Sequence, residues 1–260
     1  MNMTLEQWRE ERRRSVAKPQ GDLALTGLHL IMAKGAVPGI PGVWEPLAQG
    51  QPGLLLTAEA ADGLTWDATG QPVEGTVKLE AEREIVRVSD SVTVMATEQP
   101  GSDHLLAVYD ANAEAVQKYA GISFYPNNPD WIIGGEFAEA DKQTAAFAHV
   151  GDAEGKVRHH RSPGVIRFEY GGEFYALTPF ASGEALIVVF GDRTNGEETY
   201  GLGRMLLIEP DAEGNVQLDF NRAFLPSCAF SHHFNCPLPP AGNRLPFRVE
   251  AGEQQVIFGS

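Results

Sequence analysis

The stretch that decides the fold reads Ala185-Leu186-Ile187-Val188-Val189-Phe190-Gly191-Asp192-Arg193-Thr194-Asn195-Gly196. Its first half is apolar at successive positions, which is typical of a strand buried on both faces. Its second half is polar and lies between two glycines, so we expect a loop at the mouth of the core. Because functional groups often lie on loops held by a rigid scaffold, the search for a site starts there.

Polar motifs continue from this loop towards the C-terminus. They read Asp192-x-Thr194-x-Gly196-x-x-Thr199-Tyr200-x-x-Gly203-Arg204, Asp219-Phe220-Asn221-Arg222-Ala223-x-x-Pro226-x-Cys228-Ala229-Phe230, Cys236-Pro237-Leu238-Pro239-Pro240-x-x-Asn243-Arg244-Leu245-Pro246 and Ala251-Gly252-Glu253. This pattern resembles the bacterial and archaeal domain of unknown function 1684 family. The resemblance is weaker upstream, where it includes Trp8-Arg9 and Trp131. No activity is assigned to that family, so the resemblance implies no substrate.

Composition and charge exclude several classes of protein. The 260 residues are 43% apolar and 21% charged, as in ordinary globular domains. The net charge of −15 argues against a nucleic-acid or anionic-membrane partner, because such surfaces are bound through excess Lys and Arg. The N-terminus is charged where a secretory signal would be apolar, and no apolar run is long enough for a transmembrane helix. Two cysteines make no disulfide framework, which predicts a cytoplasmic protein.

The hydrophobic pattern predicts a mainly β protein, with antiparallel sandwich-like or barrel-like sheets and one N-terminal helix. The helix is expected over residues 4–17, with Thr4 as its N-cap. We expect three parts: the helix in 1–20, an N-terminal β half in 21–120 and a C-terminal β half in 121–260. The predicted strands are 23–32, 53–58, 64–68, 75–81, 84–89, 92–97, 132–138, 144–150, 164–170, 173–179, 184–190, 204–209, 216–220 and 247–250.

Turn chemistry adds three local predictions. Asp62-Gly63 indicates a hairpin between the strands on either side, and the Gly171-Gly172 pair indicates another. Residues 110–119, which are rich in alanine, predict a short helical turn. Residues 124–131 hold two prolines among aromatic residues and predict a rigid, packed loop.

The leading functional hypothesis is an anion site built from three arginines. Arg204, Arg222 and Arg244 would hold a carboxylate or a phosphate through planar, bidentate forks. Asn221 and Asn243 would orient this ligand. Further hydrogen bonds would come from Thr194, Thr199 or Tyr200. The predicted function is therefore binding of a small anionic molecule.

Two other classes of function use the same residues. An enzyme, most plausibly a hydrolase or lyase, would use Asp192 or Tyr200 as its catalytic proton-transfer group, although no familiar hydrolase or nucleotide-binding motif is present. A structural or partner-binding module would have no small-molecule site. In that case Asp192, Asp219 and Glu253 would pair with the arginines in a buried network. The sequence leaves these alternatives and the oligomeric state open.

Cys228, His232, His233 and Cys236 could in principle supply zinc ligands. Their spacing differs from the usual zinc patterns, so we expect no metal and no other cofactor. The cysteines are instead predicted to be small buried hydrophobic residues. The remaining histidines, which we predict on the surface or in turns, are His29, His104, His149, His159 and His160.

Overall fold

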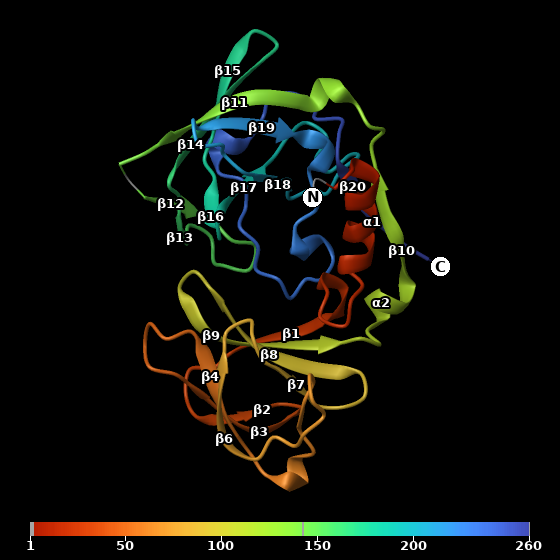
Figure 1. Cartoon of the computed structure of the whole chain (residues 1–260), viewed down its shortest axis with the longest axis vertical. Coiled ribbons are helices and arrows are strands. Elements are labelled where there is room, and N and C mark those ends of the chain that lie inside the picture. Colours follow the sequence, from red (N-terminus) through yellow and green to blue (C-terminus); the bar gives the residue numbers. More distant parts are fainter. Residues whose placement is uncertain (1–2, 142, 260) are drawn as a thin grey trace. The chain divides into compact units, whose positions relative to one another are not determined.

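The structure is a computed structural model that describes residues 3–141 and 143–259. Its contacts divide the chain into two compact units. The N-terminal unit is Arg14–Lys118, and the C-terminal unit joins the residues up to Arg13 with those from Tyr119 onward (Figure 1). Both units consist mainly of antiparallel strands, and a helix begins the chain, so the predicted fold class is confirmed. The expected boundaries after residues 20 and 120 stay predictions, because compactness does not establish independent folding.

The N-terminal unit contains two antiparallel sheets. The first has the order β1-β9-β8-β7-β5, and the second has the order β2-β3-β4-β6. The strands of the first sheet are β1 (Leu25–Leu30), β9 (Ser102–Asp110), β8 (Val92–Gln99), β7 (Ile85–Arg87) and β5 (Thr65–Trp66). Those of the second are β2 (Gly35–Val37), β3 (Ile40–Pro46), β4 (Gly53–Ala58) and β6 (Gly75–Glu80). Side chains of both sheets, among them Trp44, Leu56, Val94 and Leu106, form one apolar core, as in a β-sandwich.

Short helices complete this unit. They are η1 (Asp22–Ala24), η2 (Ala60–Asp62) and α2 (Glu114–Lys118), which confirms the predicted helical turn. The predicted hairpin at Asp62-Gly63 is wrong, because β4 pairs with β3 and β6 and not with β5. Gly63 instead ends η2 with a positive φ of 68°, while Asp62 accepts a hydrogen bond from the Glu59 backbone. The turn residues were read correctly, but the turn that they make closes a helix.

The described part of the C-terminal unit contains four sheets, one α-helix and several short 3-10 helices. The orders of the sheets are β15-β14-β11-β19, β16-β17-β18, β10-β20 and β12-β13. Their strands are β10 (Tyr119–Phe124), β11 (Ile132–Glu139), β12 (Thr144–Phe147), β13 (Arg158–Arg161), β14 (Gly164–Tyr170), β15 (Glu173–Leu177), β16 (Phe180–Ser182), β17 (Ala185–Phe190), β18 (Arg204–Ile208), β19 (Asn215–Asp219) and β20 (Glu253–Phe258). Ile166, Val188, Phe190, Leu218 and Phe220 are central to its apolar core.

Helix α1 (Leu5–Ser15) begins as the sequence predicts. The Gln7 backbone donates to Thr4 Oγ1, and the Thr4 backbone donates to Gln7 Oε1, so the two residues form a capping box. The helix lies beside β10 and β20 in Figure 1, and Trp8 meets Phe124 edge to face. None of the described helices is long and apolar enough to cross a membrane.

The segment between β19 and β20 is irregular. It contains only the short helices η4 (Phe220–Arg222), η5 (Ser227–Ala229) and η6 (Ala241–Asn243), and the strand predicted over 247–250 is wrong. The predicted packed loop holds η3 (Pro129–Trp131), with Trp131 buried in the core. The hairpin predicted at Gly171-Gly172 is confirmed, and both glycines have positive φ. Because irregular backbone lacks regular sheet partners, its buried N–H and C=O groups bond to side chains, to water or to isolated stretches of backbone.

Candidate functional site

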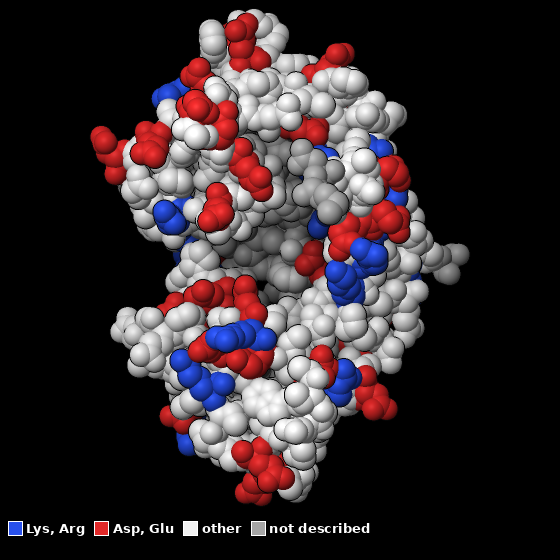
Figure 2. Space-filling view, viewed as in Figure 1, with Lys and Arg blue, Asp and Glu red and all other residues white. Residues whose placement is uncertain are grey.

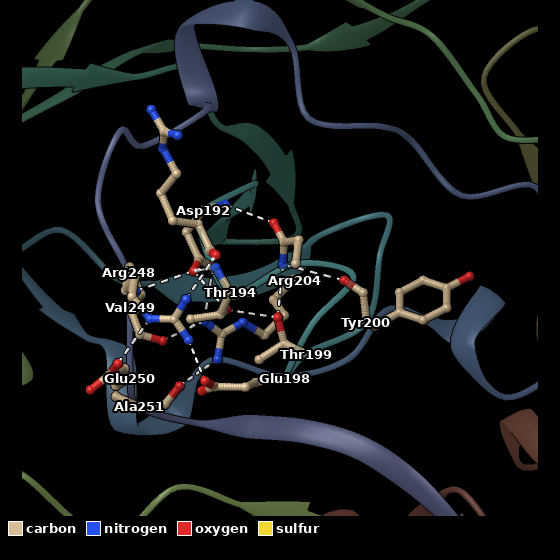
Figure 3. A network of polar contacts seen from close by, with 12 residues as sticks. Asp192, Thr194, Glu198, Thr199, Tyr200, Arg204, Arg248, Val249, Glu250 and Ala251 are labelled. Carbon is tan, nitrogen blue, oxygen red and sulfur yellow. Dashed lines mark hydrogen bonds and ion pairs between the residues drawn. The ribbon is translucent and has the colours of Figure 1, made fainter.

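The predicted site is built around a buried ion pair. Strand β17 leads into the loop that carries Asp192, and β18 begins at Arg204, so two neighbouring strands bring the residues together. Arg204 Nη2 lies 2.9 Å from Asp192 Oδ2, and both side chains are 0% exposed (Figure 3). The Arg204 guanidinium also lies 5.4 Å from the centre of the Phe190 ring.

Local hydrogen bonds occupy the other oxygen of Asp192. Asp192 Oδ1 accepts from the Thr194 backbone at 2.8 Å, from Thr194 Oγ1 at 2.6 Å and from the Val249 backbone at 3.2 Å. Thr194 and Thr199 are fully buried, and their hydroxyl oxygens lie 2.8 Å apart. The two threonines therefore hold the loop and its carboxylate in place.

Arg204 also serves the irregular segment before β20. Its Nη2 donates to the Val249 carbonyl at 2.7 Å, and its Nη1 donates to the Ala251 carbonyl (Figure 3). Its Nη1 also donates to the Glu253 carbonyl at 3.2 Å. Its Nε has no hydrogen-bond partner among the described residues. One guanidinium thus replaces the sheet neighbour that these carbonyls lack, which is the arrangement that the structural alternative requires of Arg204.

The other two arginines differ from Arg204 and from each other. Arg222 Nε lies 3.2 Å from Asp219, and Arg222 Nη2 donates to the Met3 carbonyl at 2.7 Å. Arg244 is exposed and lies against the backbone of Gly191. Within residues 3–141 and 143–259, its side chain makes no hydrogen bond or ion pair. The three guanidinium groups therefore contact different partners, and their joint binding of one anion stays a prediction.

Glu253 pairs with an arginine that the sequence analysis did not consider. Its fully buried carboxylate accepts from Arg12 Nε at 2.7 Å and from Arg12 Nη2 at 3.1 Å. Glu253 Oε2 also accepts from the Leu225 backbone at 2.7 Å, and Arg12 Nη2 donates to the Leu225 carbonyl. A run of basic residues near the end of a helix is explained by the helix dipole alone, so the sequence carried no signal for this pair.

The two asparagines each bind one distant stretch of backbone. Asn221 accepts from the Asn128 N–H and donates to the Asn128 carbonyl, both at 2.9 Å. Asn243 accepts from the Thr178 N–H at 2.8 Å and donates to the Thr178 carbonyl at 2.9 Å. It also donates to the Val189 carbonyl. Both side chains are buried. Their amides act as substitute strand neighbours and have few hydrogen-bonding positions left for a ligand.

Tyr200, the second candidate for proton transfer, donates from its hydroxyl to the Cys228 carbonyl at 3.1 Å. Burial, followed by the nearby sulfur of Cys228, raises the pKa of Tyr200 well above its ordinary value. Tyr200 therefore keeps its proton at neutral pH. Together with the occupied oxygens of Asp192, this arrangement provides no obvious general base.

The cysteines and histidines form two separate groups. The Cys228 N–H donates to Cys236 Sγ at 3.3 Å, and the rings of His232 and His233 pack 4.1 Å apart. Among the described residues, no three or more His, Cys, Asp or Glu side chains form a group that could hold a metal.

His149 and His160 correct the expectation that the remaining histidines lie on the surface or in turns. They are only 5% and 8% exposed, and their Nε2 atoms lie 2.9 Å apart. His149 Nδ1 lies 2.7 Å from the Asn235 carbonyl, which can only accept a hydrogen bond, so Nδ1 carries the proton of the neutral ring. His149 Nε2 is then unprotonated and accepts a hydrogen bond from His160 Nε2. Burial lowers the pKa of both rings, and that of His160 falls to about 4. Residue spacing offered no signal for this pair.

Comparison with known proteins agrees with the motifs. Residues 117–254 match the family model described as "Protein of unknown function (DUF1684)". Among solved structures, the chain is similar to the solution NMR structure of an uncharacterized protein from Haloarcula marismortui. The two are 30% identical over 52% of this chain and 76% of that one, with a TM-score of 0.43. No curated protein matches the chain. Since the family model matches more than half of its residues, the chain belongs to the DUF1684 family of proteins of unknown function.

Proposed function

We propose that the C-terminal unit binds a small carboxylate or phosphate at the edge of the buried network, with Arg244 as the main cationic group. The observation that carries the proposal is that the Arg244 side chain is exposed and has no carboxylate beside it among the described residues. Arg204 and Arg222, by contrast, each have one within ion-pair distance. A guanidinium in this state can offer its planar fork to a bidentate anion.

The backbone around Arg244 is arranged in a way that supports this proposal. Gly191 pairs in parallel with Arg244. A Cβ atom built on Gly191 would lie 3.5 Å from Arg244 Nη1 and 3.3 Å from Asn195 Oδ1. The Arg244 side chain therefore lies against the loop backbone at ordinary van der Waals distance, which restricts its motion and reduces the entropy lost when a ligand binds.

A second exposed arginine follows on the same loop. Arg193 lies two residues after Gly191, and its backbone N–H donates to the Phe247 carbonyl at 3.0 Å. Both arginines thus come from segments that run alongside each other. Two exposed arginines on adjoining segments support an anion site in a chain whose net charge is −15.

The test is titration of the protein with inorganic phosphate and with citrate, followed by isothermal calorimetry. We expect Arg244→Ala to weaken binding by about tenfold or more, which corresponds to the loss of one charged hydrogen bond. Arg167→Ala is the matched control, because Arg167 is also an exposed arginine of the C-terminal unit, on β14. Arg167→Ala should bind phosphate and citrate with the same affinity as the unmodified protein.

Two outcomes would contradict the proposal. Equal affinities of Arg244→Ala and Arg167→Ala would remove Arg244 from any anion site. Absence of binding of either probe to the unmodified protein would favour the structural or partner-binding alternative. The thermal midpoint of Arg244→Ala should stay within about 2 °C of the control, since exposed substitutions usually cost little stability.

A further inference from the structure

The thiol of Cys236 lies against the backbone of Cys228, although seven residues separate the two cysteines in the sequence. Cys236 Sγ is 3.3 Å from the backbone nitrogen of Cys228. That nitrogen is only three bonds from the Cys228 sulfur, so rotation about the Cα–Cβ bond of Cys228 moves its sulfur through the neighbourhood of Cys236 Sγ. A disulfide requires an S–S distance of about 2.05 Å, so the Cys228 side chain must turn towards Cys236 before a bond can form.

The loop between the cysteines is held at both ends. Near its start, the buried Phe230 ring lies 5.9 Å from the Arg12 guanidinium. Near its end, Asn235 Oδ1 accepts from the Gly151 backbone at 2.7 Å, and the Val150 backbone donates to the Cys236 carbonyl at 3.1 Å. These anchors keep the two sulfurs near each other, so little further conformational entropy is lost when a bond forms between them.

The two sulfurs differ in access and in surroundings. Cys228 is half-buried, whereas Cys236 is buried and accepts the Cys228 N–H. This hydrogen bond to sulfur stabilises the thiolate of Cys236. The thiolate is the form of a cysteine that attacks a disulfide. Tyr200 connects this pair to the loop that carries Asp192, because its hydroxyl donates to the Cys228 carbonyl. The pair is therefore part of the sequence stretch that identifies the family.

We propose that Cys228 and Cys236 are a reversible dithiol site that reacts with low-molecular-weight disulfides. In the first step, the Cys228 thiolate attacks a disulfide R–S–S–R, forms a mixed disulfide and releases one thiolate. In the second step, the Cys236 thiolate attacks the Cys228 sulfur, forms the Cys228–Cys236 bond and releases the second thiolate. The two protons lost by the cysteines end on the two released thiols, and the small disulfide is reduced as the protein is oxidised.

The experiment uses the full chain, oxidised glutathione and intact-mass spectrometry after an acid quench. The unmodified protein should lose the mass of two hydrogen atoms and recover it with dithiothreitol. Cys236→Ser should instead keep one glutathione on Cys228, because the second step has no thiol. Cys228→Ser should react at least about tenfold more slowly than Cys236→Ser, because burial limits access to Cys236. Circular dichroism checks that both variants are folded.

Three results would overturn the proposal. One is stable glutathione on the unmodified protein, which would mean that the sulfurs do not meet. Another is equal modification of the two variants, and the third is no reaction of the unmodified protein. A second measurement is independent of mass: oxidation should raise the thermal midpoint by about 5 °C through closure of a short loop, and should not do so in either variant.

Discussion

The cores of the two units are held together in different ways. The N-terminal core is apolar, and Thr93 is the only buried polar or charged residue that its described part contributes. The corresponding residues of the C-terminal unit are His149, His160, Ser162, Thr194, Thr199, Arg204, Asn221, Asn243 and Glu253. Both units are mainly β, so strand content does not explain this difference.

The explanation lies in where each backbone finds its hydrogen-bond partners. In the N-terminal unit, neighbouring strands such as β3, β4 and β6 satisfy each other's N–H and C=O groups. In the C-terminal unit, the irregular segment between β19 and β20 has few such neighbours, and Arg204 and Glu253 bind its backbone groups in their place. A buried group left unpaired costs about 1–3 kcal/mol, which accounts for the burial of these expensive side chains.

The charges at the molecular surface contribute differently. Figure 2 shows acidic groups scattered over the face in view, with basic groups lying among them. Arg248 illustrates such a surface cluster, since it contacts Glu197, Glu198 and Glu250. It therefore makes three ion pairs, in a setting where water screens each of them.

Arg204→Met should have the largest effect. It leaves the Asp192 carboxylate and three carbonyl groups buried without their donor, and breaking a buried pair in this way costs about 3–5 kcal/mol. Urea denaturation followed by tryptophan fluorescence measures the loss, with Arg167→Met as the matched exposed control. A variant as stable as this control would show that the buried polar network does not hold the C-terminal unit together.

The pH dependence of the His149–His160 pair should come next. The ordinary histidine pKa is about 6.5, and burial lowers the pKa of folded His160 to about 4. Between these values the unfolded chain binds more protons, so the stabilisation is full above pH 6.5 and is lost as the pH falls towards 4. The part of this loss that comes from His160 is about 3 kcal/mol before solvent screening.

Nearby charged groups enter the same titration. Arg158 and Lys156 further lower the pKa of His149, whereas Asp152 raises it, and Arg158 holds the pKa of Asp152 well below its usual range. His160→Gln keeps a donor for His149 Nε2 without titrating, and should flatten the dependence of the urea midpoint on pH. His159→Gln changes an exposed neighbour on β13, and its urea midpoint should depend on pH as strongly as that of the unmodified protein. An unchanged slope in His160→Gln would contradict the assignment.

Arg248→Ala should have the smallest effect, although it removes three ion pairs. The urea midpoint should not change measurably, and any residual difference should disappear at 1 M salt, where exposed charges are screened. A loss of stability as large as that in Arg204→Met would mean that the number of ion pairs, and not burial, decides how much an arginine contributes to stability.

Local sequence patterns predicted local features of the fold well. The Thr4 cap, the α2 turn, the Gly171-Gly172 hairpin and strand β14 all depend on residues within one short window. The same approach was wrong at Asp62-Gly63, because its turn chemistry suits either a hairpin or a helix end. It also missed β20, whose partner β10 is more than a hundred residues away.

By itself, the sequence determined the family, the antiparallel β class and the stretch in which charged and amide side chains gather. Only the tertiary structure decided which groups those side chains bind. Arg12 reaches Glu253, Asn221 reaches Asn128 and His149 reaches His160 across separations that no periodic pattern spans. The physical reason is that a buried donor bonds to whichever acceptor the folded backbone leaves unpaired nearby, and that acceptor is defined only once the strands have packed.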